Sequence, residues 1–244
     1  MNKQEYKNIF NLEERHFIYQ STHRNIMALL KQFLPRNKNL TILDAGCGTG
    51  LLMQKLKSFG LVYGVDNNSQ GLIFCKKRGL TNLKKASVNN LPFFKNTFDV
   101  ITCVDVLYHK DVNGQKTLSE FFRVLKPGGL IILKVPAHEN LRGKHDIFVH
   151  TRQRYKINEL KKEILKQNFN IVFISYGHQI LYPIVLVKRF WERILHSPES
   201  SDVAMPALLI NHILINLGKL ETKVMLKTGL KNGISIYAVA RKPN

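Results

Sequence analysis

The sequence has few cysteines, few acidic residues and no recognisable leader. Its 3 cysteines form no CxxC pair, which excludes a disulfide-stapled scaffold and predicts reduced thiols without structural zinc. The opening residues lack an apolar core, so we expect no secretory signal and a cytoplasmic location. A share of 44% hydrophobic residues excludes a disordered or collagen-like chain.

A long transmembrane run is also missing. The stretch from Gln167 to Val187 holds no charged residue and approaches the ~20 residues that cross a bilayer. Amide and hydroxyl side chains interrupt it, and Gly177 separates a strand-like part from a helical part. We therefore expect no spanning helix here.

Positive charge is abundant. The 37 Lys and Arg residues against 17 Asp and Glu give a formal net charge of +20, without a single basic tail. This excess favours an anionic partner, such as RNA, a phosphorylated small molecule or an anionic membrane surface. A compositional preference for Lys and Asn explains it equally well, because net charge informs association and not fold.

The hydrophobic pattern predicts strands that alternate with helices. We expect a helix that ends at Pro35, then strands at 40–43, 61–65, 99–104 and 130–135 with helices near 69–78 and 114–125. A polar connection at 136–157, a helix at 158–168 and strands at 170–176 and 234–241 complete the order. Strands that are apolar throughout indicate a parallel sheet covered on both faces, which is a doubly wound α/β fold.

The most specific motif is a strand that enters a glycine-rich loop. Glycines at 46, 48 and 50 allow a sharp turn and the close approach of a ligand. Asp66 ends the next strand, where a carboxylate can accept both hydroxyls of a ribose. The dinucleotide fingerprint needs another glycine at the position of Leu51, so the pattern favours S-adenosylmethionine over NAD.

Five motifs in order resemble the class I S-adenosylmethionine-dependent methyltransferases. They are Leu43 to Gly50, Gly64 to Asp66, Asn90 to Phe93, Phe98 to His109 and Leu125 to Gly129. The resemblance implies a Rossmann-like sheet of seven strands, mostly parallel, with the last strand antiparallel. It divides the chain into an N-terminal helical cap (1–38), a cofactor-binding α/β core (39–176), a helical insert (177–232) and a final core strand (233–244).

The resemblance also assigns cofactor contacts. The glycine loop would face the amino-acid part, Asp66 the ribose, and 87–89 the adenine. The implied set is Asp44, Gly46, Cys47, Gly48, Gly50, Asp66, Asn67, Ser87, Val88, Asn89 and Asp105. Ser87 stands where an aspartate is common, and a neutral hydrogen bond is weaker than a charge-assisted one, so we expect lower cofactor affinity.

A looser resemblance points to a bacterial subgroup associated with polysaccharide and glycolipid assembly. The shared segments are Glu13 to Tyr19, His145 to Tyr155 and Gly233 to Pro243. In the subgroup two adjacent arginines directly precede the tyrosine, whereas here Gln153 separates Arg152 from Arg154. The match is therefore firmer at Arg154 than at Arg152. The implied acceptor-binding residues are Tyr108, His138, Asp146, Arg152, Arg154 and Tyr155.

A general base is needed only if the acceptor must lose a proton, because the methyl of a sulfonium is already activated. His109, His145 and His150 are the candidate catalytic bases, and a solvated loop histidine is the alternative for each. The spacing of His145, Asp146 and His150 matches no standard metal site, so we expect no metal. We expect instead that Asp146 orients a histidine and that the two arginines hold an anionic group of the acceptor.

The insert combines apolar and basic residues. Ile184, Val187, Trp191, Ile194 and Leu195 share a helical face, and 208–220 are nearly uncharged. This pattern suits an amphipathic pair on a membrane surface or a lid on the domain or on a second subunit, so a homodimer stays open.

Three functions compete. The favoured one is an O-methyltransferase acting on a small, sugar-containing or lipid-linked acceptor in the cytoplasm or at the inner membrane face. The second is a tRNA or rRNA methyltransferase, which the charge supports although no RNA-binding module is visible. Methylation of base amines is disfavoured, because Asp105 to Tyr108 lack the Pro-Pro-aromatic block. The third, a non-catalytic subunit, conflicts with the intact glycine loop.

Overall fold

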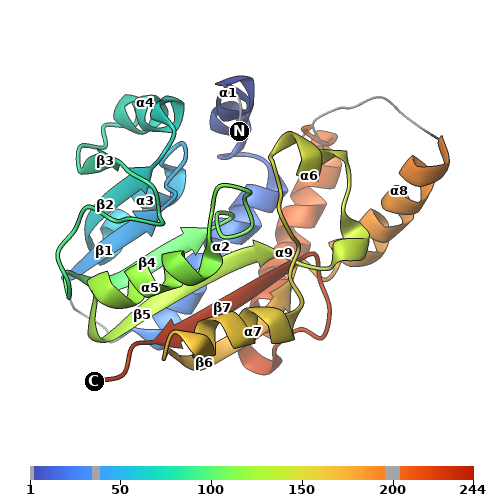
Figure 1. Ribbon diagram of the computed structural model, residues 1–244. Helices are drawn as coiled ribbons and strands as arrows, with labels where there is room; N and C mark the ends of the chain where they lie inside the picture. Colours follow the sequence, from blue (N-terminus) through green and yellow to red (C-terminus); the bar gives the residue numbers. More distant parts are fainter. Residues whose placement is uncertain (1–2, 35–38, 196–203) are drawn as a thin grey trace.

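A seven-stranded sheet forms the centre of the protein in a computed structural model that describes residues 3–34, 39–195 and 204–244 (Figure 1). The strands lie in the order β3-β2-β1-β4-β5-β7-β6. Their bounds are β1 Leu40–Ala45, β2 Gly60–Asp66, β3 Leu83–Lys85, β4 Phe98–Val104, β5 Leu125–Pro136, β6 Asn170–Gly177 and β7 Ser235–Arg241. β1 to β5 pair in parallel, and β7 runs antiparallel between β5 and β6. The predicted methyltransferase-like sheet is confirmed.

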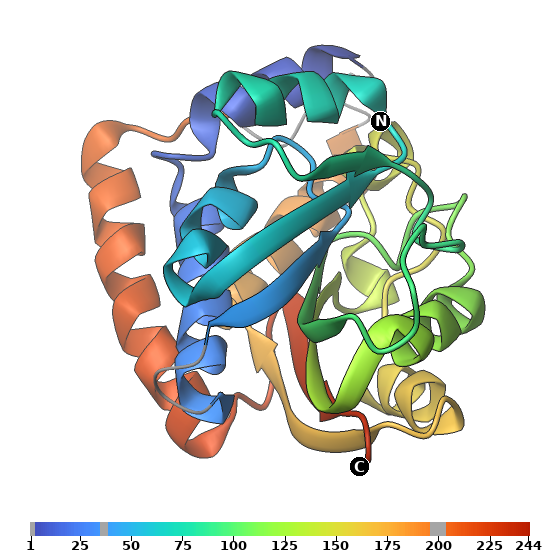
Figure 2. The ribbon, with the colours of Figure 1, turned by 90° about the vertical axis from the view of Figure 1, so that its left-hand side faces the viewer.

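Helices cover both faces of this sheet. Their bounds are α1 Lys3–Leu12, α2 Phe17–Phe33, α3 Leu51–Leu56, α4 Ser69–Lys77, α5 Gly114–Val124, α6 Lys144–Phe148, α7 Ile157–Lys166, α8 Leu181–Leu195 and α9 Leu208–Thr228, with 3-10 turns at Lys57–Phe59 and Glu139–Leu141. α5 and α7 lie on one face, and α2 and α9 lie side by side on the other (Figures 1 and 2). None of the described helices is both long enough and apolar enough to cross a bilayer.

Neighbouring residues of the central strands enter two different cores. Ile131 and Leu133 of β5 join one cluster of buried side chains with Leu118 of α5, while Ile132 joins another with Leu29 of α2. Side chains alternate between the faces of a strand, so a strand buried on both faces must be apolar throughout. This is why the strands read as continuous apolar runs.

Several boundaries differ from the sequence-based expectations. The first helix is interrupted at 13–16, because the ring of His16 accepts a hydrogen bond from the N–H of Ile18 and begins α2 anew. β5 begins at Leu125, which pairs with Phe98, and not at Leu130 as expected. The Pro-Gly-Gly segment that was expected to form a turn lies inside β5, where the register of pairing with β4 shifts. The short β3 and the helical turns within 136–157 were not expected.

The insert between β6 and β7 is helical as predicted. α8 and α9 occupy it, and Pro183 lies in the first turn of α8, where the missing N–H costs nothing. The end of the predicted cap at 35–38 and the middle of the insert at 196–203 lie outside the described residues. The same holds for the side chains of Ile194 and Leu195.

Candidate active site

The carboxyl ends of β1, β2 and β4 surround a cavity of about 270 Å³. Ligands of open α/β sheets bind at this edge. Residues from every group of the predicted site meet there: Gly46, Gly48, Asp66, Asn67, Ser87, Val88, Asp105, Tyr108, His109, His145 and His150. The sheet therefore brings most of the predicted cofactor residues and the three candidate bases to one place.

The glycine loop is shaped by close contacts and left-handed backbone. Gly46 has φ +83°, and a Cβ there would lie 2.2 Å from Cγ2 of Val106. Gly48 has φ +54° with open space where a Cβ would stand. A side chain at position 46 would collide with the wall, and one at position 48 would project beside the cavity. The loop thus leaves bare backbone for a ligand.

Asp66 is bound to this loop. Its Oδ2 accepts a hydrogen bond from the N–H of Gly48 at 2.9 Å, and its Oδ1 accepts one from the N–H of Asn68 at 2.8 Å. Burial raises the pKa of this carboxyl, and these N–H groups together with the hydroxyl of Tyr6 oppose the rise. A carboxylate offers about four lone-pair positions, so these three donors leave Asp66 capacity to accept one more hydrogen bond from a ligand.

Tyr6 of α1 was missed by the sequence analysis. Its side chain lines the cavity and is 5% exposed, and its hydroxyl bonds to Asp66. Burial, followed by the charge of Asp66, raises the pKa of Tyr6. Glu13 ties this helical segment to the loop, because its carboxylate accepts a hydrogen bond from Thr49 at 2.5 Å and pairs with Arg78 at 2.9 Å. The glutamate pair before the core was the only signal for this contact.

A second cavity of about 130 Å³ shares Gly46 and Gly48 with the first and reaches Asp44 and His23. Asp44 is 2% exposed, and burial raises its pKa to about 7 although the hydroxyl of Thr102 donates to it at 2.7 Å. Nδ1 of His23 is buried and finds no hydrogen-bond partner among the described residues. Burial and then nearby cations lower the pKa of His23 to about 3. Nothing in the sequence pattern pointed to His23.

Asp105 stands between the two cavities with φ +58°. Its Oδ2 accepts a hydrogen bond from Nζ of Lys134 on β5 at 2.6 Å. The lysine is 8% exposed, so Asp105 joins the edge of both cavities to a buried basic side chain. The pair holds the end of β4 against β5.

The three candidate bases differ in the freedom of their rings. Both ring nitrogens of His109 face backbone carbonyls: Nδ1 lies 2.8 Å from the oxygen of Val149, and Nε2 lies 3.1 Å from the oxygen of Asp105. Burial lowers the pKa of His109. His150 is exposed and has φ +57°. Nδ1 of His145 is buried and unpartnered among the described residues. The backbone therefore holds the ring of His109 at both nitrogens, whereas Nδ1 of His145 is not held by a hydrogen bond among the described residues.

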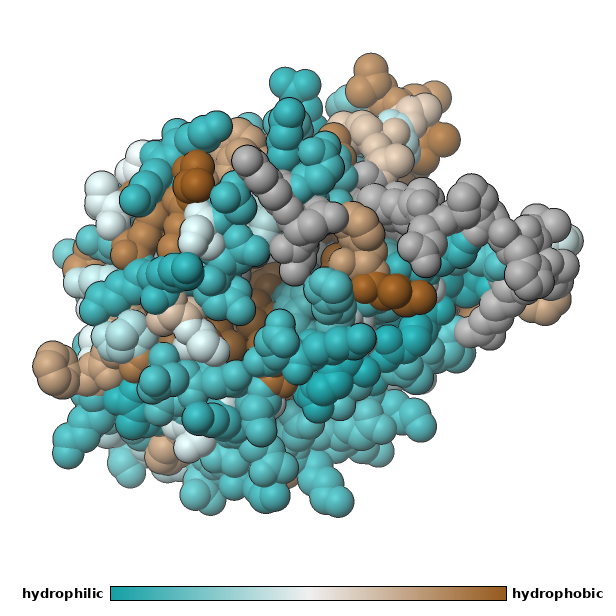
Figure 3. All heavy atoms as spheres, turned by 45° about the horizontal axis from the view of Figure 1, so that its top comes forward, coloured by the Kyte–Doolittle hydropathy of each residue, from teal (hydrophilic) through white to brown (hydrophobic). Residues whose placement is uncertain are grey.

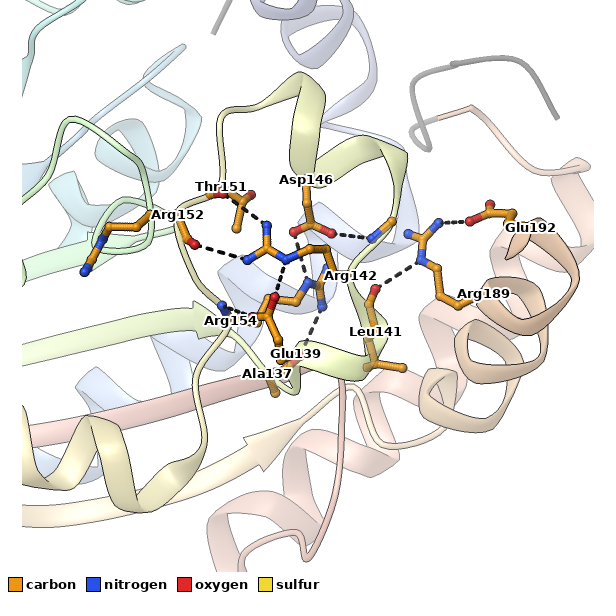
Figure 4. A network of polar contacts seen from close by, with 11 residues as sticks. Ala137, Glu139, Leu141, Arg142, Asp146, Thr151, Arg152, Arg154, Arg189 and Glu192 are labelled. Atoms are coloured by element: carbon orange, nitrogen blue, oxygen red, sulfur yellow. Dashed lines mark hydrogen bonds and ion pairs between the residues drawn. The ribbon is translucent and has the colours of Figure 1, made fainter. Parts of the chain in front are cut away.

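The expected acceptor residues near α6 form a network of their own (Figure 4). Asp146 is 2% exposed and accepts hydrogen bonds from Nε of Arg154 at 3.0 Å and from the N–H of Gly143 at 2.8 Å. Arg154 also donates to the carbonyl of Ala137 at 3.0 Å. The expectation that Asp146 orients a histidine is not met, because its carboxylate is engaged by an arginine and a backbone N–H.

Other expected residues lie outside both cavities. Tyr155 is fully buried, and its hydroxyl faces Glu163 at 3.4 Å. His138 stacks on Tyr176 with ring centroids 4.9 Å apart. Arg152, Asn89 and Gly50 do not line the cavities either. Arg152 donates to the backbone carbonyl of Leu107, and the side chain of Asn89 accepts from the N–H that precedes α5. Gly50 is the residue at which α3 begins. In the described ranges, no three His, Cys, Asp or Glu side chains gather as a metal site.

The comparisons with known proteins bear on this site. A family model described as a methyltransferase domain matches residues 43–133, from β1 into β5. An uncharacterised protein of Methanocaldococcus jannaschii is 32% identical over 176 residues, which cover 68% of this chain and 74% of that protein. The chain belongs to the class I S-adenosylmethionine-dependent methyltransferases. S-adenosylmethionine is accordingly its cofactor.

Named relatives of this methyltransferase have varied substrates. It is 33% identical to a tRNA U34 carboxymethyltransferase of Desulfotalea psychrophila and 30% identical to a malonyl-[acyl-carrier protein] O-methyltransferase of Buchnera aphidicola. These matches cover 43% and 55% of this chain, and 35% and 60% of the relatives. The methyltransferase thus spans less than two thirds of either named relative.

A solved structure shares the fold of this methyltransferase. The phosphoethanolamine N-methyltransferase 2 of Haemonchus contortus, in complex with S-adenosyl-L-methionine, superposes with a TM-score of 0.59 at 21% identity. The superposition covers 91% of this chain and 52% of that one.

Proposed function

We propose that this methyltransferase transfers a methyl group to a hydroxyl oxygen of a small, sugar-containing or lipid-linked acceptor by direct in-line displacement. The observation that supports this most is that His145, whose Nδ1 has no hydrogen-bond partner among the described residues, lines the same cavity as Asp66 and the glycine loop. A neutral imidazole nitrogen suits the removal of a hydroxyl proton. The similarity to an O-methyltransferase acting on an acyl carrier protein points to the same bond type.

The first cavity fits the nucleoside part of the cofactor. The carboxylate of Asp66 retains capacity to accept a hydrogen bond from a ribose hydroxyl, and Asn67 lines the same cavity. Ser87 and Val88 line the far side for the adenine, where the serine hydroxyl already accepts from the N–H of Asn89 at 3.2 Å. The absence of side chains at Gly46 and Gly48 leaves room for the part of the cofactor that links its nucleoside to its amino-acid group.

The second cavity fits the methionine part. Asp44 would hold the ammonium group, and a ring N–H of His23 would donate to the carboxylate. A buried polar atom without a partner is costly, and a ligand carboxylate would satisfy it. The residues present therefore match a zwitterionic amino acid at one end and a ribose at the other.

The chemistry needs alignment above all. The cofactor supplies a methyl group already activated on a sulfonium. The cavity walls would hold the acceptor oxygen in line with that methyl, a contribution that reaches ~7–11 kcal/mol when two reactants are fully oriented. His145 would accept the proton of the hydroxyl, and Tyr108 lines the same cavity.

A transfer assay tests the proposal. Methyl-labelled S-adenosylmethionine is offered with the protein to the membrane-lipid, small-molecule and RNA fractions of a bacterial extract, with Asp66→Ala as the inactive control. We expect label in the lipid or small-molecule fraction, and a ~100-fold lower rate for His145→Ala, within the range for loss of a general base. Label confined to RNA, or full activity of His145→Ala, would refute the O-methylation proposal.

The second candidate is a tRNA or rRNA substrate. The formal net charge of +20 and the similarity to a tRNA-modifying enzyme favour it. Salt separates the two candidates, because binding to phosphates weakens steeply with ionic strength. A steep loss of acceptor affinity between low and physiological salt would support RNA.

A further inference from the structure

α9 turns its apolar side chains outward. Residues of one helical face recur at spacings of three and four and are 36–59% exposed: Ile210, Ile213, Leu217, Leu220 and Val224. Leu208 and Leu209 in the first turn are 71% and 73% exposed. The row therefore extends from the first turn of α9 to Val224, on the helix that lies beside α2 in Figure 2.

Of the four buried side chains of α9, Asn211, Glu221 and Thr222 are polar and Met225 is apolar. Asn211 is buried, and its amide donates to the carbonyl of Arg15 at 2.9 Å while its oxygen accepts from the N–H of Phe17. Thr222 is buried and donates to Asn25 of α2 at 2.6 Å. A helix whose apolar stripe faces the core is the usual arrangement, so α9 is inverted. Its apolar row is not needed for the contact with α2.

α8 shows the same inversion. Ile184, Val187, Phe190 and Trp191 are 53–59% exposed. Arg189 is 6% exposed instead, donating to the carbonyl of Leu141 at 3.1 Å and to Glu192 at 2.5 Å (Figure 4). Burial of an arginine beside exposed large apolar side chains means that the outer face of α8 is built for an apolar environment.

The exposed charges of α9 indicate what kind of surface would bind there. The exposed ionisable side chains of α9 are His212, Lys219, Lys223 and Lys227, while Glu221 is turned inward and accepts from the N–H of Ile180 at 3.0 Å. A second copy would bring another net charge of +20 against this surface. An anionic surface with an apolar interior matches both the rows of apolar side chains and the lysines.

We propose that the outward faces of α8 and α9 dock on an anionic lipid surface. The apolar side chains enter the boundary between headgroups and acyl chains, and the lysines contact lipid phosphates. Apolar surface gathers over the first turns of α9, at the upper edge of Figure 3. The proposal is independent of the acceptor, because it concerns a surface away from the cavity residues.

Vesicle cosedimentation of the protein tests the docking. Vesicles of phosphatidylcholine alone are compared with vesicles that also contain phosphatidylglycerol. The variant Ile213→Gln/Leu220→Gln removes apolar side chains of α9, and Leu61→Gln/Leu165→Gln is the matched control, because those leucines are 51% and 55% exposed on β2 and α7. We expect the α9 variant to bind anionic vesicles at least ~10-fold more weakly and the control to bind as the parent does.

A third variant, with Lys219, Lys223 and Lys227 changed to Gln, should lose the preference for anionic vesicles. Binding of S-adenosylhomocysteine and the melting temperature verify that each variant is folded, and neither should change by much. Absence of binding to anionic vesicles by the parent, or unaltered binding by the α9 variant, overturns the proposal. A dimer by light scattering that the α9 variant abolishes, without vesicle binding, assigns the surface to a second copy instead.

Discussion

The N–H of Gly48 donates a hydrogen bond to Oδ2 of Asp66 over 2.9 Å. This contact joins the loop after β1 to the acid that ends β2, so the two halves of the motif form one rigid wall of the cavity. The wall has no side chain at position 48. The importance of this for cofactor binding can be tested by adding a methyl group there and, as a control, at a glycine of similar backbone conformation outside the site.

Gly48→Ala should weaken cofactor binding without unfolding the protein. Gly48 and Gly79 have φ +54° and +72°, and neither would place a Cβ within 4 Å of another atom. Alanine at either position should cost ~1 kcal/mol of stability for its left-handed backbone. Only Gly48 lines the cavities, so only Gly48→Ala should raise the Kd of S-adenosylhomocysteine, by ~10-fold or more, in calorimetric titration. Equal effects of the two variants on binding would contradict this role.

Asp44 should make stability depend on pH. Burial raises its pKa to about 7 in the folded chain, above the unfolded value near 3.8. Between these values the folded state holds a proton that the unfolded state has lost, so the contribution of this group to stability falls as pH rises towards 7. Asp44→Asn should thus gain stability relative to the parent from pH 4 to pH 8, by up to about 4 kcal/mol in urea unfolding. A difference that is constant with pH would refute the assignment.

His23→Ala should affect one end of the cofactor only. If Nδ1 of His23 binds the methionine carboxylate, the variant should bind S-adenosylhomocysteine ~10-fold more weakly, the loss expected for one hydrogen bond to a charged group. It should bind methylthioadenosine, which lacks the carboxylate, as the parent does. Equal weakening of both ligands would show that the change acts on the cavity as a whole.

Arg154→Ala should destabilise the fold. The side chains of Arg154 and Asp146 are 11% and 3% exposed, and removing one partner leaves a buried charge, which costs ~3–5 kcal/mol. The double variant Arg154→Ala/Asp146→Ala should lose less than the sum of the two single variants in thermal unfolding. Additive losses would show that the pair does not act together. A higher KM for the acceptor in a folded Arg154→Lys protein would reveal the role in acceptor binding that the sequence suggested.

The local part of the site was predictable. The glycine loop and Asp66 lie at the ends of neighbouring strands, and parallel pairing of β1 with β2 brings such ends together whatever surrounds them. His109 and His145 likewise follow strands that end at the same sheet edge. Tyr6 and His23 were missed because they approach the loop from helices that precede the sheet, and helical spacing says nothing about that docking.

The sequence by itself determined the order of strands and helices, the parallel sheet and the cofactor motif, because hydrophobic periodicity and glycine conformation act over a few residues. Only the tertiary structure decided which histidine nitrogen is unpartnered, that Asp146 pairs with Arg154, and that α8 and α9 turn their apolar faces outward. Periodicity identifies an apolar face of a helix but not its direction. That direction follows from long-range polar contacts, such as those of Asn211 and Arg189, which form only when distant segments pack together.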